Sequence, residues 1–157
     1  MAKTIEQLEG DFWGKPEFTS HVVVTSHMLR KKPVDEFGVE ELRFMIGQNI
    51  GTQYLMPRVL GMLEQTPLIT DYHYPGEVLH SVLKLPNAYW LAHPDHVKRA
   101  CNVSRLALEK LAEICERKKA YSLHKESVVL NDHKCLDRTE RMIQDLAKEF
   151  IATHCSY

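Results

Sequence analysis

The spacing of the apolar residues most constrains how this chain can fold, because they recur every three or four positions along most of the sequence. That spacing is the period of one helix face, whereas a half-buried strand repeats every two residues. After Pro94 one face is apolar and the other is charged; the apolar members are Val97, Cys101, Ala107, Leu108, Leu111, Ile114 and Cys115. This pattern predicts a long amphipathic helix that begins at about Pro94.

A second apolar stripe of the same spacing lies near the C-terminus. It consists of Leu136, Met142, Ile143, Leu146, Ala147, Phe150 and Ile151. The stripe predicts a second helix, which Asp132 or Asp137 could cap. Between the two helices, SLHKESVVLNDH (122–133) is interpreted as a loop or a short extended piece. Helical stripes with short connections predict an all-α fold, a mostly helical bundle with at most a minor short strand or extended segment.

The N-terminal half keeps the helical period but is interrupted by proline and glycine. Residues 19–32 predict a helix that ends in a basic last turn before a proline, although the HVVV run within them would equally suit a short strand. An acidic start and apolar spacing predict a helix from about Val39 to Asn49. Pro57 predicts a kink in the following helix, or a helix that begins there. Four prolines make 67–96 the least regular part of the chain.

Length and charge narrow the class of protein. A chain of 157 residues fits one domain that spans residues 1–157, since a domain usually has about 100 to 200 residues. Twenty Lys and Arg against 21 Asp and Glu give a net charge of -1, so the chain lacks the positive field that supports direct nucleic-acid binding. No apolar run approaches the roughly 20 residues that cross a bilayer. The N-terminus also lacks a signal-peptide pattern, and we therefore expect a cytoplasmic protein without membrane contact.

The four cysteines are widely spaced and form no C-x-x-C pair; they are Cys101, Cys115, Cys135 and Cys155. In a chain without an export signal, four reduced thiols are expected rather than two disulfides. Cys101 and Cys115 share the apolar stripe of the long helix, so we interpret them as small core residues. None of the four lies in a recognisable nucleophile motif.

Nine histidines raise the question of metal chemistry, and the tightest pair is His93 and His96 in the sequence HPDH. A zinc site needs three or four ligands that converge on one point, and only this pair is close in sequence. The simpler interpretation is a helix that starts at the proline, with Asp95 as a first-turn acid. The sequence therefore predicts no enzyme, no catalytic residue, no metal ligand and no cofactor. The alternative is a small helical metal-dependent hydrolase that uses His93 and His96.

The segment from Val59 to Val97 is acidic and rich in aromatic residues, which favours a protein-binding face. The candidate contact residues are Asp71, Tyr72, Tyr74, Glu77, Tyr89, Trp90 and Asp95. For each aromatic residue, burial in the core is the competing interpretation. The run from Lys98 to Lys125 has the opposite, basic bias, which fits a solvated helix face or, as a minority hypothesis, a nucleic-acid site.

Several motifs in the first half of the chain occur together. They are LEGDFWG (8–14), LRKKP (29–33), ELRFMIGQNIG (41–51) and YPGEVLHSVLKLP (74–86). In this combination the chain resembles the immunity proteins of bacterial contact-dependent growth inhibition systems. The resemblance covers about half of the chain and none of it beyond Trp90.

The resemblance implies a small cytoplasmic protein that is not an enzyme. Such a protein binds the C-terminal toxin domain of a large secreted effector and neutralises it. The toxins are commonly nucleases, often directed at tRNA, and the acidic, aromatic segment would suit an inhibitor of a basic nuclease. On this basis the seven candidate contact residues become candidate toxin-binding residues.

The segment LRFMIGQNIG (42–51) is interpreted as scaffold rather than as a contact site. An interior glycine costs about 1 kcal/mol relative to alanine and needs a packing reason. Gly47 is predicted to permit close helix approach and Gly51 to mark a helix end. Gln48 and Asn49 are expected to bind a neighbouring backbone through hydrogen bonds.

Overall fold

The computed structural model describes residues 2–124 and 135–155. In these ranges the chain forms eight α-helices and one 3-10 helix and contains no β-strand, which confirms the predicted all-α fold. The elements are α1 (Ile5–Glu9), α2 (His21–Arg30), η1 (Val34–Glu36), α3 (Val39–Gly47), α4 (Thr52–Gln65), α5 (Glu77–Leu83), α6 (Asn87–Ala92), α7 (Pro94–His124) and α8 (Arg138–His154). None of the described helices is long and apolar enough to span a membrane.

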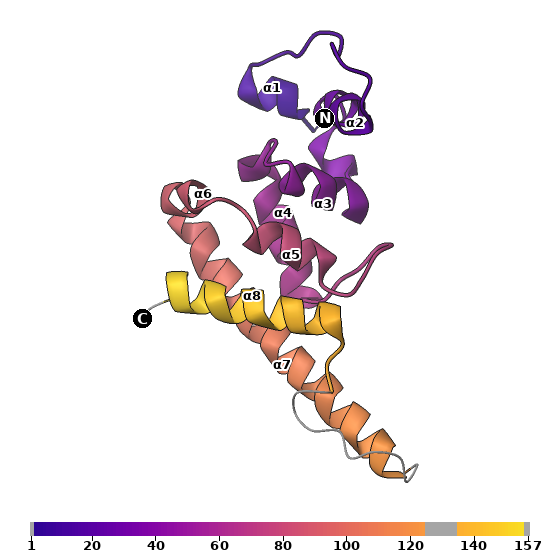
Figure 1. The fold of residues 1–157 in the computed structure, drawn as a ribbon. Helices are drawn as coiled ribbons and strands as arrows, with labels where there is room; N and C mark the ends of the chain where they lie inside the picture. The colour runs from indigo at the N-terminus through magenta and orange to yellow at the C-terminus, as the bar shows by residue number, and fades with distance from the viewer. Residues whose placement is uncertain (1, 125–134, 156–157) are drawn as a thin grey trace.

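The N-terminal helices lie at one end of the molecule and α7 reaches the other, while α6 and α8 turn back beside earlier helices (Figure 1). The short helices α1 and α2 lie at one end, α3, α4 and α5 form the middle, and α7 runs diagonally to the opposite end with α8 across it. Helix α4 packs against α7, and α8 packs against both α7 and α5. One cluster of buried apolar side chains connects these layers, with Ile5, Leu42, Leu60, Leu79, Ala107 and Ile143 among its members.

Helix α2 is capped at its N-terminus by the side chain of Ser20. The Ser20 hydroxyl accepts a hydrogen bond from the Val23 N–H at 3.4 Å, which is the usual role of a serine N-cap. All of the HVVV run is helical, so the alternative of a short strand is wrong. The local cap and the continuing apolar spacing outweigh the strand preference of three consecutive valines.

Helix α3 ends at Gly47, two residues before the predicted end, and α4 begins at Thr52 rather than at Pro57. Pro57 lies inside α4 and removes the helix hydrogen bond to the carbonyl of Gln53. Gln53 is exposed, so water can satisfy that carbonyl. Farther along, the irregular 67–96 segment still contains α5 and α6, because its prolines fall between these helices.

Gly51 requires glycine for two reasons, whereas Gly47 does not. Gly51 has φ +61°, and a Cβ there would lie 2.6 Å from Cδ1 of Ile5, in a backbone region that side chains disfavour. At Gly47 the nearest atom to an added Cβ is Oγ of Ser81 at 3.8 Å, an ordinary contact. The prediction of close approach at Gly47 is therefore wrong, and the close approach occurs at Gly51. Gly51 directly precedes the first residue of α4, whereas α3 already ends at Gly47.

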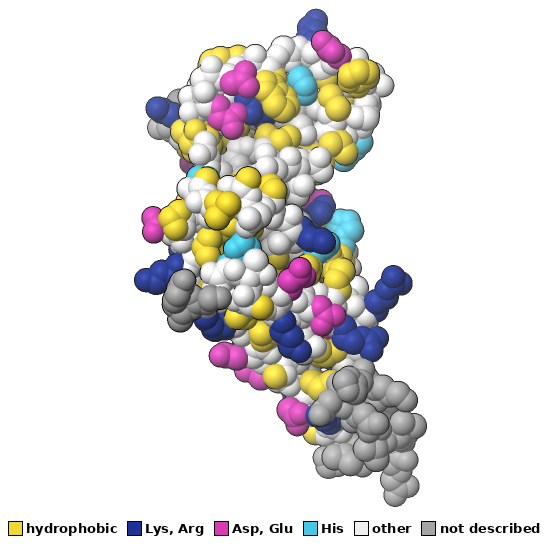
Figure 2. Space-filling model, turned by 60° about the vertical axis from the view of Figure 1, so that its left-hand side comes forward, with side chains coloured by type: hydrophobic (Ala, Val, Ile, Leu, Met, Phe, Trp, Pro, Cys, Tyr) yellow, Lys and Arg dark blue, Asp and Glu magenta, His cyan; other side chains and the backbone are white. Residues whose placement is uncertain are grey.

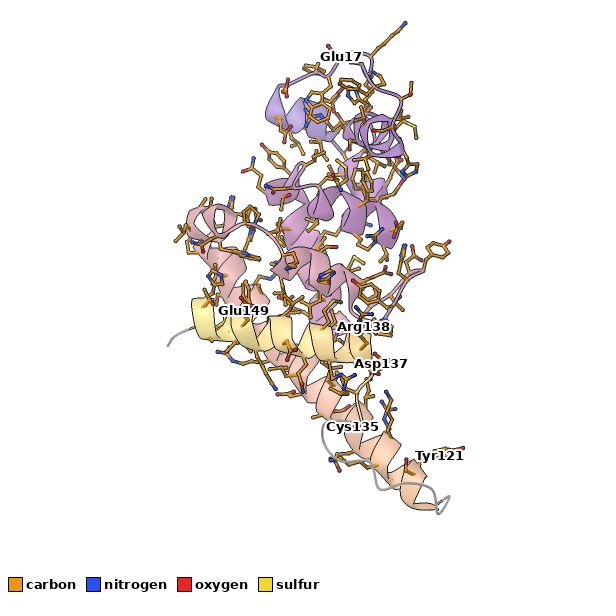
Figure 3. The ribbon with its side chains drawn as sticks, viewed as in Figure 1. Glu17, Tyr121, Cys135, Asp137, Arg138 and Glu149 are labelled. Carbon is orange, nitrogen blue, oxygen red and sulfur yellow. A yellow bond between two sulfur atoms is a disulfide. The ribbon has the colours of Figure 1, made fainter. Side chains whose placement is uncertain are left out.

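The predicted long helix and the C-terminal helix are both present. Asp137 caps α8, since its Oδ1 accepts a hydrogen bond from the Glu140 N–H at 2.8 Å. Figure 3 shows Asp137 and Arg138 at one end of α8, Glu149 toward the other, and Tyr121 far along α7. The segment 122–133 is interpreted as a loop or a short extended piece, but its first three residues continue α7 and the interpretation is wrong for them. Its remaining residues, with the alternative cap Asp132, lie outside the described residues.

Both ends of α8 are joined to α7 by disulfides. Cys101 pairs with Cys155, with their Cα atoms 5.9 Å apart, and Cys115 pairs with Cys135, with their Cα atoms 5.0 Å apart. The expectation of four reduced thiols is therefore wrong for this structure. Sequence separations of 54 and 20 residues gave no sign of the pairing, because only the packing of α8 on α7 brings these side chains together.

Candidate protein-binding surface

The motif LEGDFWG meets the motif LRKKP around one buried arginine. Arg30 is only 2% exposed and pairs through Nη1 with the Glu9 carboxylate. Its Nη2 donates to the Asp11 carbonyl at 2.7 Å, and the guanidinium lies 4.1 Å from the centre of a Trp13 ring. A buried charge needs such partners, because an unpaired one is costly. These motif residues therefore hold α1 and the following loop against α2.

A second set of contacts connects LRKKP with α3. The Lys32 ammonium donates to both carboxylate oxygens of Glu41 at 2.8 Å. Glu41 also accepts a hydrogen bond from the Gly38 N–H at 2.8 Å and so caps α3. Tyr54 of α4 donates to the carbonyl of Leu8 at 3.2 Å. The shared motifs thus bind to one another, which supports their interpretation as scaffold.

At the exposed corner of LRFMIGQNIG, the Asn49 side chain forms a local hydrogen bond. Gln48 and Asn49 are both exposed. Asn49 has φ 54°, and its Oδ1 accepts a hydrogen bond from the Thr52 hydroxyl at 3.0 Å. The expected hydrogen bond from Asn49 to a neighbouring backbone is therefore wrong, because the side chain turns to the first residue of α4 instead.

Trp90 and Tyr89, both predicted contact residues, belong to the core. Trp90 is 2% exposed and packs edge-on against Phe150, with ring centres 4.9 Å apart. The Tyr89 hydroxyl lies 2.7 Å from Nδ1 of His96, and burial strongly raises the pKa of Tyr89. A partner cannot reach these two side chains directly, so the competing interpretation of core burial applies to both.

Glu77 is a third predicted contact that the structure buries. Its side chain is 2% exposed. Its Oε1 accepts hydrogen bonds from the Asp71 N–H at 2.7 Å, the Tyr72 N–H at 3.2 Å and the Thr70 hydroxyl at 3.2 Å. Burial would raise the pKa of Glu77, but these hydrogen bonds outweigh it and hold the pKa below its usual range. Glu77 therefore positions the loop before α5 and is not itself a contact surface.

The remaining predicted residues lie at two separate places on the surface. Asp71 and Tyr72 are exposed on the loop between α4 and α5, where Tyr72 is 81% exposed. Tyr74 is half-buried beside them, with its hydroxyl 2.7 Å from Nδ1 of His80. Asp95 is exposed at the start of α7, on the other side of the molecule from that loop (Figure 1). The structure brings Asp71, Tyr72 and Tyr74 together and leaves Asp95 apart.

Another group of exposed apolar side chains was not recognised from the sequence. Its members lie on the segment that joins α1 to α2 and on α2 itself; they are Phe12, Phe18, Val22 and Met28. Figure 2 shows hydrophobic side chains beside acidic ones at this end of the molecule. The sequence signal for this group is that Phe12 and Phe18 belong to no helical stripe and therefore have no predicted core position.

His93 and His96 lie side by side, with ring centres 5.2 Å apart. Burial lowers the pKa of His96, and its Nδ1 is occupied by Tyr89. Over residues 2–124 and 135–155 no third metal-ligating group converges on this pair. Asp95 instead lies in the first turn of α7, as predicted. Among the described residues, nothing at His93 and His96 favours the metal-dependent hydrolase.

Several of the basic side chains on α7 pair with nearby acids. Lys118 pairs with Glu140 at 2.6 Å. Two further lysines, Lys110 and Lys119, pair with glutamates one helical turn away at 3.0 and 2.9 Å. This arrangement supports the interpretation of a solvated helix face over that of a nucleic-acid site.

Comparison with known proteins gives one family. The family model described as CDI immunity proteins matches residues 7–100 of this chain. No curated protein and no solved structure matches the chain. The matched range contains all of the motifs that converge on Arg30 and Glu41, and it ends early in α7. The match covers more than half of the 157 residues, and the chain therefore belongs to the family of CDI immunity proteins.

Proposed function

We propose that this protein binds the C-terminal toxin domain of its cognate contact-dependent growth inhibition effector in the bacterial cytoplasm. In this proposal the protein inhibits the toxin by binding alone, without turnover chemistry. Family membership carries the proposal. The pairing of motif side chains with one another, Arg30 with Glu9 and Lys32 with Glu41, supports it, because these side chains serve the scaffold and leave partner contacts to other exposed residues.

The loop between α4 and α5 is the proposed toxin-binding surface. Tyr72 offers a large aromatic side chain to solvent, and aromatic anchors supply much of the binding energy in protein interfaces. Asp71 adds a negative charge next to it. We propose that the toxin is a nuclease, in particular an RNase or tRNase, because a phosphate-binding surface is basic and would attract such a carboxylate.

Co-purification with the cognate toxin domain tests the proposal, followed by an assay of total cellular RNA with and without this protein. The expected result is a stable complex in which RNA cleavage is suppressed. A complex with a toxin that leaves RNA intact would exclude the RNase proposal but keep the immunity function. Absence of a complex would contradict the immunity function itself.

A matched pair of variants tests the surface. Tyr72→Ala is expected to weaken toxin binding at least tenfold, about 1.4 kcal/mol, without changing the melting temperature. Tyr121→Ala is the control, since Tyr121 is also exposed but lies at the far end of α7 (Figure 3). Equal affinities of both variants and the wild type would remove this loop from the interface.

A further inference from the structure

Three potential metal ligands converge where α3 meets the loop before α5. They are Glu40 in the first turn of α3, His73 in the loop, and Glu77 at the start of α5. One ligand atom from each lies within 4.8 Å of the other two. His73 is 56% exposed, so an ion can reach the cluster from solvent, whereas Glu77 closes it from the protein side.

Glu77 contributes an oxygen that the protein leaves without a hydrogen bond. Its Oε1 accepts three hydrogen bonds from the loop, but its buried Oε2 accepts none. A buried carboxylate oxygen without a partner is unfavourable, and native structures usually satisfy such atoms. This oxygen faces His73 and Arg43, and its position calls for a positively charged group.

The geometry between His73 and Glu77 fits two ligands of one ion. His73 Nδ1 lies 2.9 Å from Glu77 Oε2, yet the contact does not have hydrogen-bond geometry. Two ligands that each lie about 2.0 to 2.1 Å from a tetrahedral zinc are about 3.3 Å apart, with both lone pairs directed at the metal. A small movement of the exposed histidine would give that separation.

Arg43 is compatible with an ion at this place. Its guanidinium hydrogen-bonds both oxygens of Glu40, with Nε to Oε2 at 2.8 Å, and its Nε lies 3.6 Å from Glu77 Oε2. A carboxylate has about four lone-pair sites, so Glu40 can keep this pairing and still bind a metal. Ligating carboxylates are commonly held by such outer hydrogen bonds. The two carboxylates and the guanidinium together carry a net charge of -1, which favours the binding of a cation.

We propose that Glu40, His73 and Glu77 bind a divalent transition-metal ion, with water completing its coordination. One imidazole and two carboxylates form a ligand set that suits zinc. The bound ion would join α3 to the loop and to α5, and would hold in place the loop that carries Tyr72. This site is separate from the His93 and His96 pair, and the proposal does not depend on toxin binding.

Titration calorimetry with ZnCl2 tests the site, using the full chain with both disulfides intact, no affinity tag and prior removal of metal by EDTA. We expect one equivalent of zinc to bind and to raise the melting temperature. His73→Ala should weaken zinc binding about tenfold or more, because it removes one ligand. The exposed His21 at the start of α2 packs against Phe44 of α3 but is not one of the converging ligands, so His21→Ala should bind zinc as the wild type does.

Cobalt supplies an independent readout. Co²⁺ bound to the wild type should show the visible absorption of a low-coordinate site, and His73→Ala should lack it. Absence of zinc binding, or equal zinc binding by the wild type and His73→Ala, would overturn the metal site. Those results would leave the immunity function untouched, since that function is measured with the toxin.

Discussion

The two halves of the molecule hold their helices together in different ways. The N-terminal helices α1 to α6 have 14 residues or fewer, and buried or half-buried charges connect them. The hairpin of α7 and α8 has helices of 31 and 17 residues, a continuous apolar stripe and two disulfides. All four cysteines lie beyond residue 100, outside the range that matches the family. Short helices are marginal alone, so the first half needs specific side-chain contacts.

Reduction of the disulfides should have the largest effect on stability, confined to the hairpin. The chain-entropy model gives about 4 kcal/mol for a bridge over a loop as long as that of Cys101 and Cys155. Urea unfolding with and without reductant measures the loss, and thiol titration of the denatured, unreduced protein should find no free thiol. Four free thiols would contradict both bridges and restore the expectation from the sequence.

Arg30→Met should have the next largest effect and should destabilise the other half. The substitution keeps most of the side-chain volume but leaves Glu9 without its buried partner, which should cost about 3 kcal/mol. Urea unfolding measures the change. Arg58→Met is the control, because Arg58 is exposed and donates one hydrogen bond, to the Val34 carbonyl. Similar losses in both variants would refute a special role for the buried arginine.

Gly51→Ala and Gly47→Ala separate the two glycines of LRFMIGQNIG. Gly51→Ala should cost about 2 kcal/mol, because it combines a left-handed backbone with a Cβ that meets Ile5. Gly47→Ala should be neutral or slightly stabilising, since alanine favours helix by up to about 1 kcal/mol. Thermal unfolding of the two variants and the wild type measures both changes in stability. A larger loss at Gly47 would mean that the close approach lies there after all.

Glu77→Gln should have the smallest destabilising effect, about 1 kcal/mol at pH 7, and one that depends on pH. The pKa of Glu77 is lower in the folded than in the unfolded protein, so its charge stabilises the fold above the unfolded pKa. That stabilisation is lost as the pH falls through the folded pKa, in the region below about pH 4.5. The difference between wild type and variant in urea unfolding should therefore shrink on acidification. A difference that stays constant with pH would exclude the charge as its source.

The sequence was sufficient to predict those features that depend on residues close together in the chain. The period of the stripes predicted α7 and α8, and Asp137 was among the predicted caps. The prediction of the seven candidate contacts rests on acidic and aromatic character alone, and that character does not distinguish surface from core. Tyr72 is exposed and Trp90 is buried, although both lie in the same acidic, aromatic segment. What separates them is the Phe150 ring of α8, which is 60 residues away from Trp90 in the chain.

By itself, the sequence determined the helical class, the approximate starts of α2, α3, α7 and α8, and the motifs that mark the family. These depend on spacing, caps and breakers within a few residues of one another. Tertiary structure alone decided that Arg30 is buried between α1 and α2, that α8 is bridged twice to α7, and that Glu40, His73 and Glu77 converge. The reason is physical, since each of these features needs atoms that are far apart in the chain to meet within a few ångströms.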